Sequence, residues 1–366
     1  MTAFSGNDSV HMARALQLAE QGRYTARPNP MVGCVIVKGD SVVGEGWHQR
    51  AGEAHAEINA LQAAANSAAG ASVYVTLEPC AHHGKTPPCA AALIDARVAR
   101  VVVALQDPYE AVSGRGLEML RAAGIDVETG LMATAAAALN EGFASRVTRG
   151  RPLVRLKVAA SLDGAIAMNN GESQWITGPA AREDVQRLRA QSGAVMTGIG
   201  TVLADDPSLN VRSADLPESI TQPLRVVLDS SLRMPLSAAM LALPGATLVC
   251  YSGHGDPAGL VAAGAEVCRC DAHDAGVDAH TVLAELAKRE VNDVLVEAGP
   301  ALTGHLLEQQ LVDELVIYQS PHIMGSETRR MFDTPSFRSL SDRLRLDIVD
   351  VRRVGDDTRI TARPAY

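Results

Sequence analysis

Two short stretches between positions 54 and 89 place four side chains together that can bind metal or carry protons: His55, Glu57, Cys80 and Cys89. His55 and Glu57 begin a predicted helix, and the two cysteines bracket a loop that opens the next one. A catalytic zinc ion takes three protein ligands and leaves the fourth position to water, a source of hydroxide near neutral pH. We expect one zinc per chain on the histidine and both cysteines, with Glu57 free to carry protons.

The spacing matches one half of a zinc deaminase signature and departs from the other. That signature is H-x-E followed by P-C-x-x-C, whereas here "HAE" is followed by "PC" and a second cysteine nine positions later. A longer loop can return its thiol to the same metal, but the match to nucleoside and nucleic-acid deaminases is weaker. The alternative is a histidine and two cysteines that merely lie near turns. His48, His82 and His83 are expected to contact substrate or solvent rather than metal.

An alternation of helices and strands is predicted to position these residues. Over residues 1–148 it indicates a layered α/β domain. The expected helices are 9–22, 56–70, a segment after Pro88, 115–124 and 132–147, and the expected strands are 31–37, 41–47, 71–77, 100–105 and 125–130.

The pattern restarts after residue 148, so residues 149–366 are predicted to form a second α/β domain. Cys268 and Cys270 lie on one face of a predicted strand and are interpreted as structural, as is Cys34. The expected elements are strands 153–160, 193–199, 224–229, 246–251, 265–270, 293–299 and 313–319, helices 179–191 and 300–312, a loop at 201–212 and a hairpin at 344–364.

Charge and composition exclude several classes of protein. The net charge is −9, with 11 basic and 14 acidic residues before position 149 and 22 and 28 after it. The chain has no dense lysine or arginine run, so we expect no nucleic-acid partner. It has no apolar run of membrane-spanning length and no signal-peptide pattern at its start. Six cysteines in 366 residues do not indicate a disulfide scaffold, and a reducing, cytoplasmic location is predicted.

The longest motifs resemble the bifunctional deaminase–reductase family of bacterial riboflavin biosynthesis. They are "RPNPMVGCVIVKGD", "YVTLEPCAHHGKTPPC", "KVAASLDGAIAMNNGESQWITG" and "VEAGPALTGHLL". The resemblance implies a cytidine-deaminase-like three-layer αβα domain and a dihydrofolate-reductase-like α/β domain that uses NADPH. It assigns zinc to His55, Cys80 and Cys89, and proton transfer to Glu57. Asn29 matches a pyrimidine-holding residue, although an asparagine beside proline is equally typical of a turn.

In the second half, a strand ends near Glu297, and a glycine turn leads into a helix at Pro300. Backbone N–H groups there can bind a phosphate, or the segment is an ordinary turn. The resemblance implies that this segment contacts the cofactor. The full set of implied cofactor contacts is Ala159, Trp175, Thr201, Asp205, Ser230, Gly299, Pro300, Ala301, Leu302, Thr303, Gly304 and His305.

Substrate contacts are also implied, and Arg189 and Arg212 are candidate phosphate clamps because a guanidinium binds phosphate through two donors. The alternative for both is solvated surface charge. Lys157, Asp205 and Glu297 are the candidate proton carriers for carbonyl reduction, although Lys157 in a strand can simply pair with an acid. The implied substrate contacts in this half are Ser173, Arg189, Leu209, Arg212 and Glu297.

The resemblance therefore predicts a homo-oligomeric, dimeric enzyme acting on a small phosphorylated pyrimidine. It would first deaminate 2,5-diamino-6-(5-phosphoribosylamino)pyrimidin-4-one and then reduce the ribosyl group to ribityl. One rival interpretation is a deaminase of tRNA or nucleosides, which would show a basic face and a P-C-x-x-C loop. Another is a non-enzymatic zinc scaffold that binds nucleotides, which would need four ligands and no spare carboxylate.

Overall fold

A computed structural model describes residues 4–81, 88–110, 112–217, 220–273, 276–334 and 337–366. The chain divides into two compact units, Met1–Gly150 and Arg151–Tyr366. This division lies close to the boundary predicted between residues 148 and 149. Each unit is described separately.

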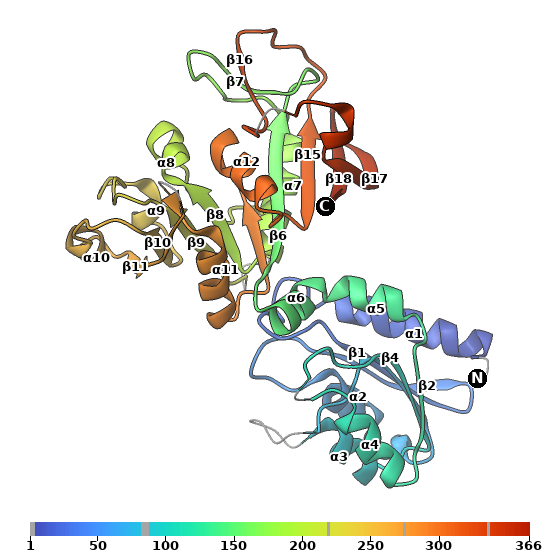
Figure 1. Ribbon diagram of the computed structural model, residues 1–366. Helices are drawn as coiled ribbons and strands as arrows, with labels where there is room; N and C mark the ends of the chain where they lie inside the picture. The colour runs from blue at the N-terminus through green and yellow to red at the C-terminus, as the bar shows by residue number, and fades with distance from the viewer. Residues whose placement is uncertain (1–3, 82–87, 111, 218–219, 274–275, 335–336) are drawn as a thin grey trace. The chain divides into compact units, whose positions relative to one another are not determined.

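The first unit contains a five-stranded sheet in the order β2-β1-β3-β4-β5 (Figure 1). β1 pairs antiparallel with β2 and β3, and β3, β4 and β5 run parallel. The strands are β1 (Gly33–Lys38), β2 (Ser41–Trp47), β3 (Ser72–Leu77), β4 (Arg100–Leu105) and β5 (Asp126–Thr129). The helices are α1 (Gly6–Glu20), α2 (Ala56–Ala64), the short 3₁₀ helix η1 (Ala65–Ala68), α3 (Cys89–Asp95), α4 (Arg115–Ala122), α5 (Ala133–Leu139) and α6 (Glu141–Arg149).

Helices cover both faces of this sheet. Side chains alternate between the faces of a strand, so Cys34 and Ile36 of β1 pack in the core under α2, α3 and α4. Val35 and Val37 pack on the opposite face, with α1 and α5. The predicted three-layer αβα architecture is confirmed.

One predicted helix, 132–147, is interrupted. α5 ends and α6 begins at Asn140, whose backbone is not helical (φ −122°, ψ 25°). The Asn140 side chain accepts a hydrogen bond from the Met31 N–H at 2.8 Å and donates one to the Met31 carbonyl at 2.9 Å. This long-range pair breaks a segment whose alanine content favours one continuous helix.

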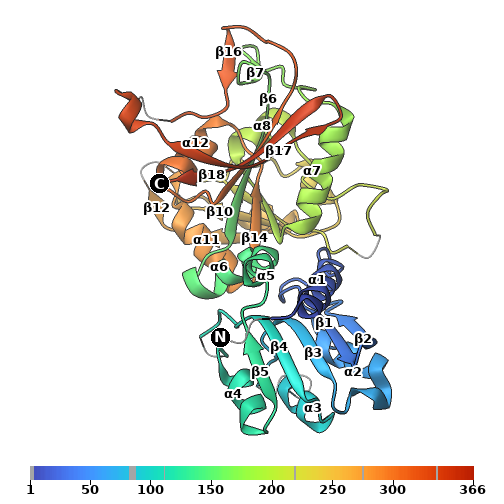
Figure 2. The same cartoon turned by 90° about the vertical axis from the view of Figure 1, so that its right-hand side faces the viewer.

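The second unit contains a nine-stranded sheet in the order β11-β10-β9-β8-β14-β6-β15-β18-β17, seen from another side in Figure 2. The strands from β11 to β15 run parallel, and β18 and β17 are antiparallel. The strands of this sheet are β6 (Leu153–Ala160), β8 (Ala194–Gly198), β9 (Leu224–Leu228), β10 (Thr247–Tyr251), β11 (Glu266–Arg269), β14 (Asp293–Val296), β15 (Glu314–Gln319), β17 (Arg345–Val354) and β18 (Asp357–Ala365).

Two short strand pairs lie outside this sheet, and neither was predicted. They are β7 (Ala165–Met168) with β16 (Thr328–Arg330), and β12 (Ala272–His273) with β13 (Gly276–Val277). The helices are α7 (Pro179–Gln191), α8 (Ile199–Asp205), α9 (Ala239–Ala242), α10 (Ala258–Ala262), α11 (Ala279–Lys288), α12 (Pro300–Glu308) and the short 3₁₀ helix η2 (Leu340–Asp342).

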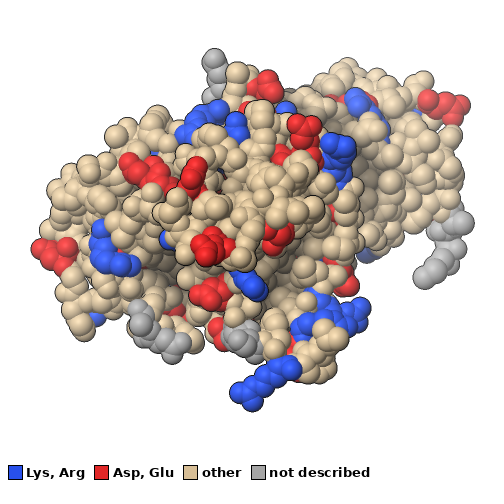
Figure 3. Space-filling view, turned by 90° about the horizontal axis from the view of Figure 1, so that it is seen from above, with Lys and Arg blue, Asp and Glu red and all other residues tan. Residues whose placement is uncertain are grey.

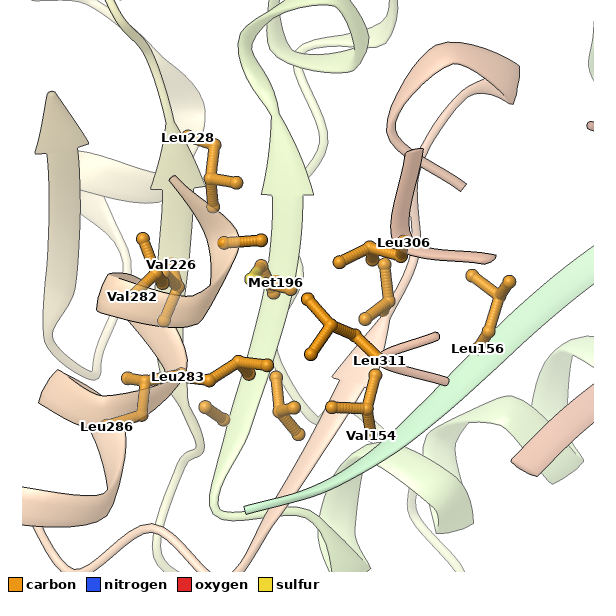
Figure 4. Packing of buried hydrophobic residues seen from close by; sticks show 14 of the residues in the cluster. Val154, Leu156, Met196, Val226, Leu228, Val282, Leu283, Leu286, Leu306 and Leu311 are labelled. Carbon is orange, nitrogen blue, oxygen red and sulfur yellow. The ribbon is translucent and has the colours of Figure 1, made fainter. Parts of the chain in front are cut away.

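Hydrophobic side chains fill both sides of the large sheet. Figure 4 shows one side, where Leu283 and Leu286 of α11 pack against strand residues such as Val226 and Met196. The opposite side packs against α7, α9 and α10. The expected α/β organisation of this unit is confirmed.

The predicted loop at 201–212 is wrong at its start, because α8 extends to Asp205. Ile199 and Val202 of this helix are buried, and their packing explains a helix where aspartates and a proline suggested a loop. The predicted hairpin near the C-terminus is confirmed as β17 and β18, joined through Gly355 in a left-handed conformation (φ 64°).

Within the described part of the chain, no helix has the length and apolar character needed to cross a membrane. On the face drawn in Figure 3, lysine and arginine side chains are interspersed with aspartate and glutamate.

Candidate functional sites

His55, Cys80 and Cys89 come together in the first unit. One ligand atom from each lies within 4.8 Å of the other two. The His55 Nδ1 atom is 3.7 Å from the Cys80 Sγ and 3.3 Å from the Cys89 Sγ. The donor set of one imidazole and two thiols is the one that a catalytic zinc site uses, so these residues fit the metal.

Local structure accounts for this convergence. His55 is the residue before α2, and its side chain makes no capping hydrogen bond, so the imidazole is available as a ligand. Cys80 follows β3, and Cys89 is the first residue of α3. The backbone N–H of Cys89 points at the Cys80 Sγ at 3.3 Å. A helix N-terminus favours negative charge, so this position favours a thiolate.

Glu78, which sequence analysis did not select, ties the Cys80 loop to α4. Its buried carboxylate accepts backbone hydrogen bonds from Gly114 and Gly116, both at 2.9 Å. Only the neighbouring proline and cysteine in "LEPC" hint at this role, because the partners lie more than 35 residues away in sequence.

The thiols have unequal acidities. Hydrogen bonds from Cys89 and His55 lower the pKa of the Cys80 thiol to about 4, against the opposing effect of burial. The neighbouring Cys80 sulfur and burial raise the pKa of Cys89. The hydrogen bond with Cys80 also raises the pKa of His55. The cluster already favours one thiolate, the form in which cysteine binds metal.

Glu57 lies in the first turn of α2 and is 3% exposed. Burial raises the pKa of its carboxyl to about 7. A group that titrates near neutral pH can both accept and release a proton there, which suits a general acid–base role.

Asn29 lies beside this cluster, in contact with His48. The Asn29 Nδ2 and His48 Nε2 atoms are 3.0 Å apart, and the His48 ring meets that of His55 edge-on at 5.4 Å. Burial lowers the pKa of His48. His48, which ranked low as a candidate, therefore holds Asn29 next to His55. His82 and His83 lie outside the described residues.

The second unit contains a cavity of about 1140 Å³. It brings together most of the residues expected to contact cofactor or substrate in this unit. The ones that line it are Lys157, Ala159, Ser173, Trp175, Arg189, Thr201, Asp205, Leu209, Arg212, Ser230, Glu297, Gly299, Pro300, Ala301, Leu302 and His305.

Thr303 and Gly304 are not among the lining residues. Thr303 is fully buried, and its hydroxyl donates to the carbonyls of Pro300 and Met331. A Cβ at Gly304 would lie 2.1 Å from the carbonyl oxygen of Asp333. Both residues pack α12 against the 331–333 segment, so any contact they make with a cofactor remains a prediction.

A charged triad stands in the wall of the cavity. Glu297 accepts hydrogen bonds from Arg189 at 2.6 and 3.1 Å and from Lys157 at 3.4 Å. Burial raises the pKa of Glu297, but the charges of Arg189 and Lys157 outweigh it and leave the pKa at about 2. Lys157 therefore does pair with an acid, as the alternative interpretation held.

The two candidate phosphate clamps differ. Arg189 is 8% exposed, and its third nitrogen donates to the Asn210 carbonyl at 3.0 Å. The Arg212 side chain is exposed, with only a 3.5 Å contact to the Asn210 side chain. Arg212 is the more exposed of the two guanidinium groups, and both line the cavity.

Sequence reasoning missed several lining residues. Gln186 accepts the Arg212 backbone N–H at 3.0 Å, and His273 and Arg329 reach the cavity from segments far apart in sequence. A polar residue in α7 and two in the unpredicted strand pairs carry no local motif, so no signal in the sequence marks them.

Residues 5–105 match the cytidine and deoxycytidylate deaminase zinc-binding region, and residues 152–360 match the RibD C-terminal domain. The riboflavin biosynthesis protein RibD of Escherichia coli is 47% identical over 359 residues, which cover 96% of this chain and 97% of that protein. The chain belongs to the RibD family. The Haemophilus influenzae RibD is 43% identical over 373 residues, covering 100% and 99% of the two chains.

Solved structures extend the RibD match over both units. An Acinetobacter baumannii RibD is similar with a TM-score of 0.92 and 45% identity, covering 98% of this chain and 99% of that one. A Thermotoga maritima protein described as a diaminohydroxyphosphoribosylaminopyrimidine deaminase and 5-amino-6-(5-phosphoribosylamino)uracil reductase has a TM-score of 0.85, 32% identity and the same coverage. The chain is a bifunctional riboflavin biosynthesis enzyme with a zinc-binding deaminase region and a reductase domain.

Proposed function

We propose that residues 1–148 deaminate 2,5-diamino-6-(5-phosphoribosylamino)pyrimidin-4-one to 5-amino-6-(5-phosphoribosylamino)uracil. Residues 149–366 then reduce the ribosyl group with NADPH to 5-amino-6-(5-phosphoribitylamino)uracil. The proposal rests on the arrangement of each unit. The first unit brings together three candidate zinc ligands with a buried carboxyl beside them, and the second has a cavity lined by the expected contact residues, with a charged triad in its wall. The test is incubation of the purified enzyme with the diaminopyrimidine, with and without NADPH, following ammonia and product mass. Ammonia release without NADPH and a mass gain of two hydrogens only with it support the proposal, and failure of either step contradicts it.

In the deaminase site, His55, Cys80 and Cys89 would hold one zinc ion. A zinc ion there would make a bound water acidic enough to react near neutral pH. Glu57 takes a proton from the attacking water and delivers it to the ring nitrogen and then to the departing amine. Asn29, oriented by His48, hydrogen-bonds the pyrimidine.

The zinc assignment is tested by metal analysis of Cys80→Ser and Cys89→Ser. The intact enzyme is expected to carry about one zinc per chain, and each variant much less, because two protein ligands hold zinc poorly. Cys34→Ser, at a buried cysteine outside the cluster, is the control and should keep its zinc. Full occupancy in both ligand variants would contradict the assignment.

In the reductase site, the turn at Gly299 and the N-terminus of α12 would bind the NADPH phosphates. Thr201 lies next to this turn, where its hydroxyl accepts the Gly299 N–H at 3.2 Å, and Ser230 also lines the cavity. NADPH bound in this cavity would supply the hydride that reduces the ribose carbonyl. Lys157, positioned by Glu297, donates a proton to the carbonyl oxygen. Asp205 is an exposed residue that lines this cavity, and it is proposed to contact both the cofactor and the reacting group.

We assign the substrate phosphate to Arg212, with Arg189 holding Glu297 in place. Ser173 and Leu209 line the same region. Arg212→Ala should weaken reduction of phosphorylated substrate roughly ten- to a hundredfold while changing little for the dephosphorylated compound. An unchanged preference would remove Arg212 from the phosphate site.

A dimer and a cytoplasmic location belong to the same proposal. β17 is an edge strand with Ile348, Val349 and Val351 more than half exposed, and a second copy of the chain would cover them. All six cysteines are unpaired thiols in the structure, which suits a reducing compartment. Analytical ultracentrifugation should find a dimer, and Ile348→Asp should shift it toward monomer.

A further inference from the structure

Three cysteines that the proposed chemistry does not use meet at one edge of the reductase sheet. Cys250 lies in β10, Cys268 lies opposite it in β11, and Cys270 follows β11 directly. The Sγ atoms of Cys268 and Cys270 are 4.0 Å apart. Cys250 is fully buried, Cys270 is 7% exposed and Cys268 is partly exposed.

We propose that Cys268 and Cys270 are a reversible oxidation site, closed to a disulfide by hydrogen peroxide or a similar small peroxide. The Cys270 sulfur attacks one peroxide oxygen, which breaks the O–O bond, forms a sulfenic acid and releases water. The Cys268 sulfur then attacks the Cys270 sulfur, forming the S–S bond and releasing a second water. The peroxide gains the two electrons that the thiols lose, and both thiol protons end in water.

The environment of Cys270 favours it as the attacking sulfur. Hydrogen bonds from Cys250 and Cys268 lower its pKa to about 7, against the effect of burial. The thiolate is the reactive form of cysteine. Burial raises the pKa of Cys268 to about 11, which suits it to the second step, and its partial exposure admits a reductant.

The fold allows a disulfide to form between Cys268 and Cys270, and it makes that disulfide easy to reduce. Residues two apart in a strand place their Cα atoms about 6.5 Å apart, near the upper limit for a disulfide. Among the described strands, β11 lies at one edge of the sheet, beside β10 (Figure 1). The Cys270 N–H, just past the end of β11, donates to the Tyr251 carbonyl at 2.8 Å. The backbone there is held by β10 on one side only, so we expect a disulfide between Cys268 and Cys270 to form under strain. Strained disulfides are the reducible, regulatory ones.

Cys270 is also linked to the cavity. The chain after it runs through β12 and β13, and His273, Gly276 and Val277 of these strands line the cavity. The Ser252 hydroxyl donates to the Gly276 carbonyl at 3.1 Å, and the Asp278 N–H donates to the Asp271 carbonyl at 2.9 Å. A disulfide at Cys270 would therefore shift the segment that follows it, which forms part of the cavity wall. We expect the oxidised enzyme to bind NADPH more weakly.

Peptide mapping tests the disulfide without reference to any activity. The zinc-loaded full chain is treated with hydrogen peroxide, alkylated and cut with trypsin, which cleaves after Arg269 and separates Cys268 from Cys270. The two fragments should remain joined through these cysteines, should separate with dithiothreitol, and should still join in Cys250→Ala. Cys34 in the same digest should stay alkylatable. Separate fragments after oxidation, or a bond from Cys270 to Cys250, would overturn the assignment.

A fluorescence titration with NADPH tests the linkage, which rests on the proposed function. Oxidation should weaken binding at least about threefold, dithiothreitol should restore it, and Cys268→Ser should not respond. Equal affinity before and after oxidation would refute the linkage. Failure of the reduced enzyme to bind NADPH would instead contradict the proposed function, while the mapped disulfide would stand.

Discussion

Glu57 shows how one buried carboxyl is prepared for proton transfer. Burial holds its pKa at about 7, and it lies two residues from a proposed zinc ligand. Glu57→Gln keeps the size of the side chain but removes the proton carrier. Zinc should stay bound, and deamination should fall by at least about a hundredfold. Ammonia release and metal content measured on the same sample check both expectations, and deamination at near wild-type rate would contradict the role of Glu57.

A single residue, Glu297, makes the stability of the second unit depend on pH. Arg189 and Lys157 depress its pKa from the ordinary 4.5 to about 2. The ionised carboxylate therefore adds its full contribution to the free energy of unfolding above about pH 4.5, and this contribution is lost as the pH falls through about 2. The contribution is on the order of 3 kcal/mol. Glu297→Gln should lower the melting temperature at neutral pH and flatten its fall between pH 5 and 2.

The matched control for this prediction is Glu308→Gln, at an exposed residue that ends α12. It should leave the melting profile unchanged. A Glu297→Gln profile parallel to that of the wild type would show that the triad does not couple stability to pH in this range.

At the scale of elements, α12 depends on close packing at one glycine. A Cβ at Gly304 would lie 2.1 Å from the backbone of Asp333, whereas one at Gly200 in α8 would meet nothing within 4 Å. Gly304→Ala should cost about 1–3 kcal/mol, or roughly 2–4 °C in melting temperature per kcal/mol for a unit of this size. Gly200→Ala should be neutral or slightly stabilising, because alanine favours helix over glycine. Thermal unfolding compares the two, and equal melting temperatures would contradict the packing argument.

At the scale of the whole molecule, the two reactions should be separable. Each unit has its own hydrophobic core. The candidate zinc ligands belong to the first unit, and the residues that line the cavity belong to the second. Removing zinc with a chelator should abolish deamination and leave NADPH-dependent reduction of supplied deaminated substrate nearly unchanged. Asp205→Ala should slow reduction and spare ammonia release. Loss of reduction in a folded, zinc-depleted enzyme would show that the sites are not independent.

Local sequence determined most of the elements and the candidate metal ligands of this protein. Strand 153–160 and helix 179–191 were predicted at the ends that they have in the structure. Hydrophobic periodicity and helix-start residues act over a few positions, so they can be read along the chain. His55, Cys80 and Cys89 were recognisable because a metal restricts both residue type and spacing.

The tertiary structure alone decided the remaining features. Asn140 divides a predicted helix because it hydrogen-bonds Met31, more than a hundred residues earlier. Glu297 joins Arg189 and Lys157 across three elements, so Arg189, which was predicted as a phosphate clamp, also pairs with a buried carboxylate. Long-range hydrogen bonds and ion pairs depend on which strands become neighbours in the sheet. That order brings β14 beside β6 and β8, and no local pattern in the sequence encodes it.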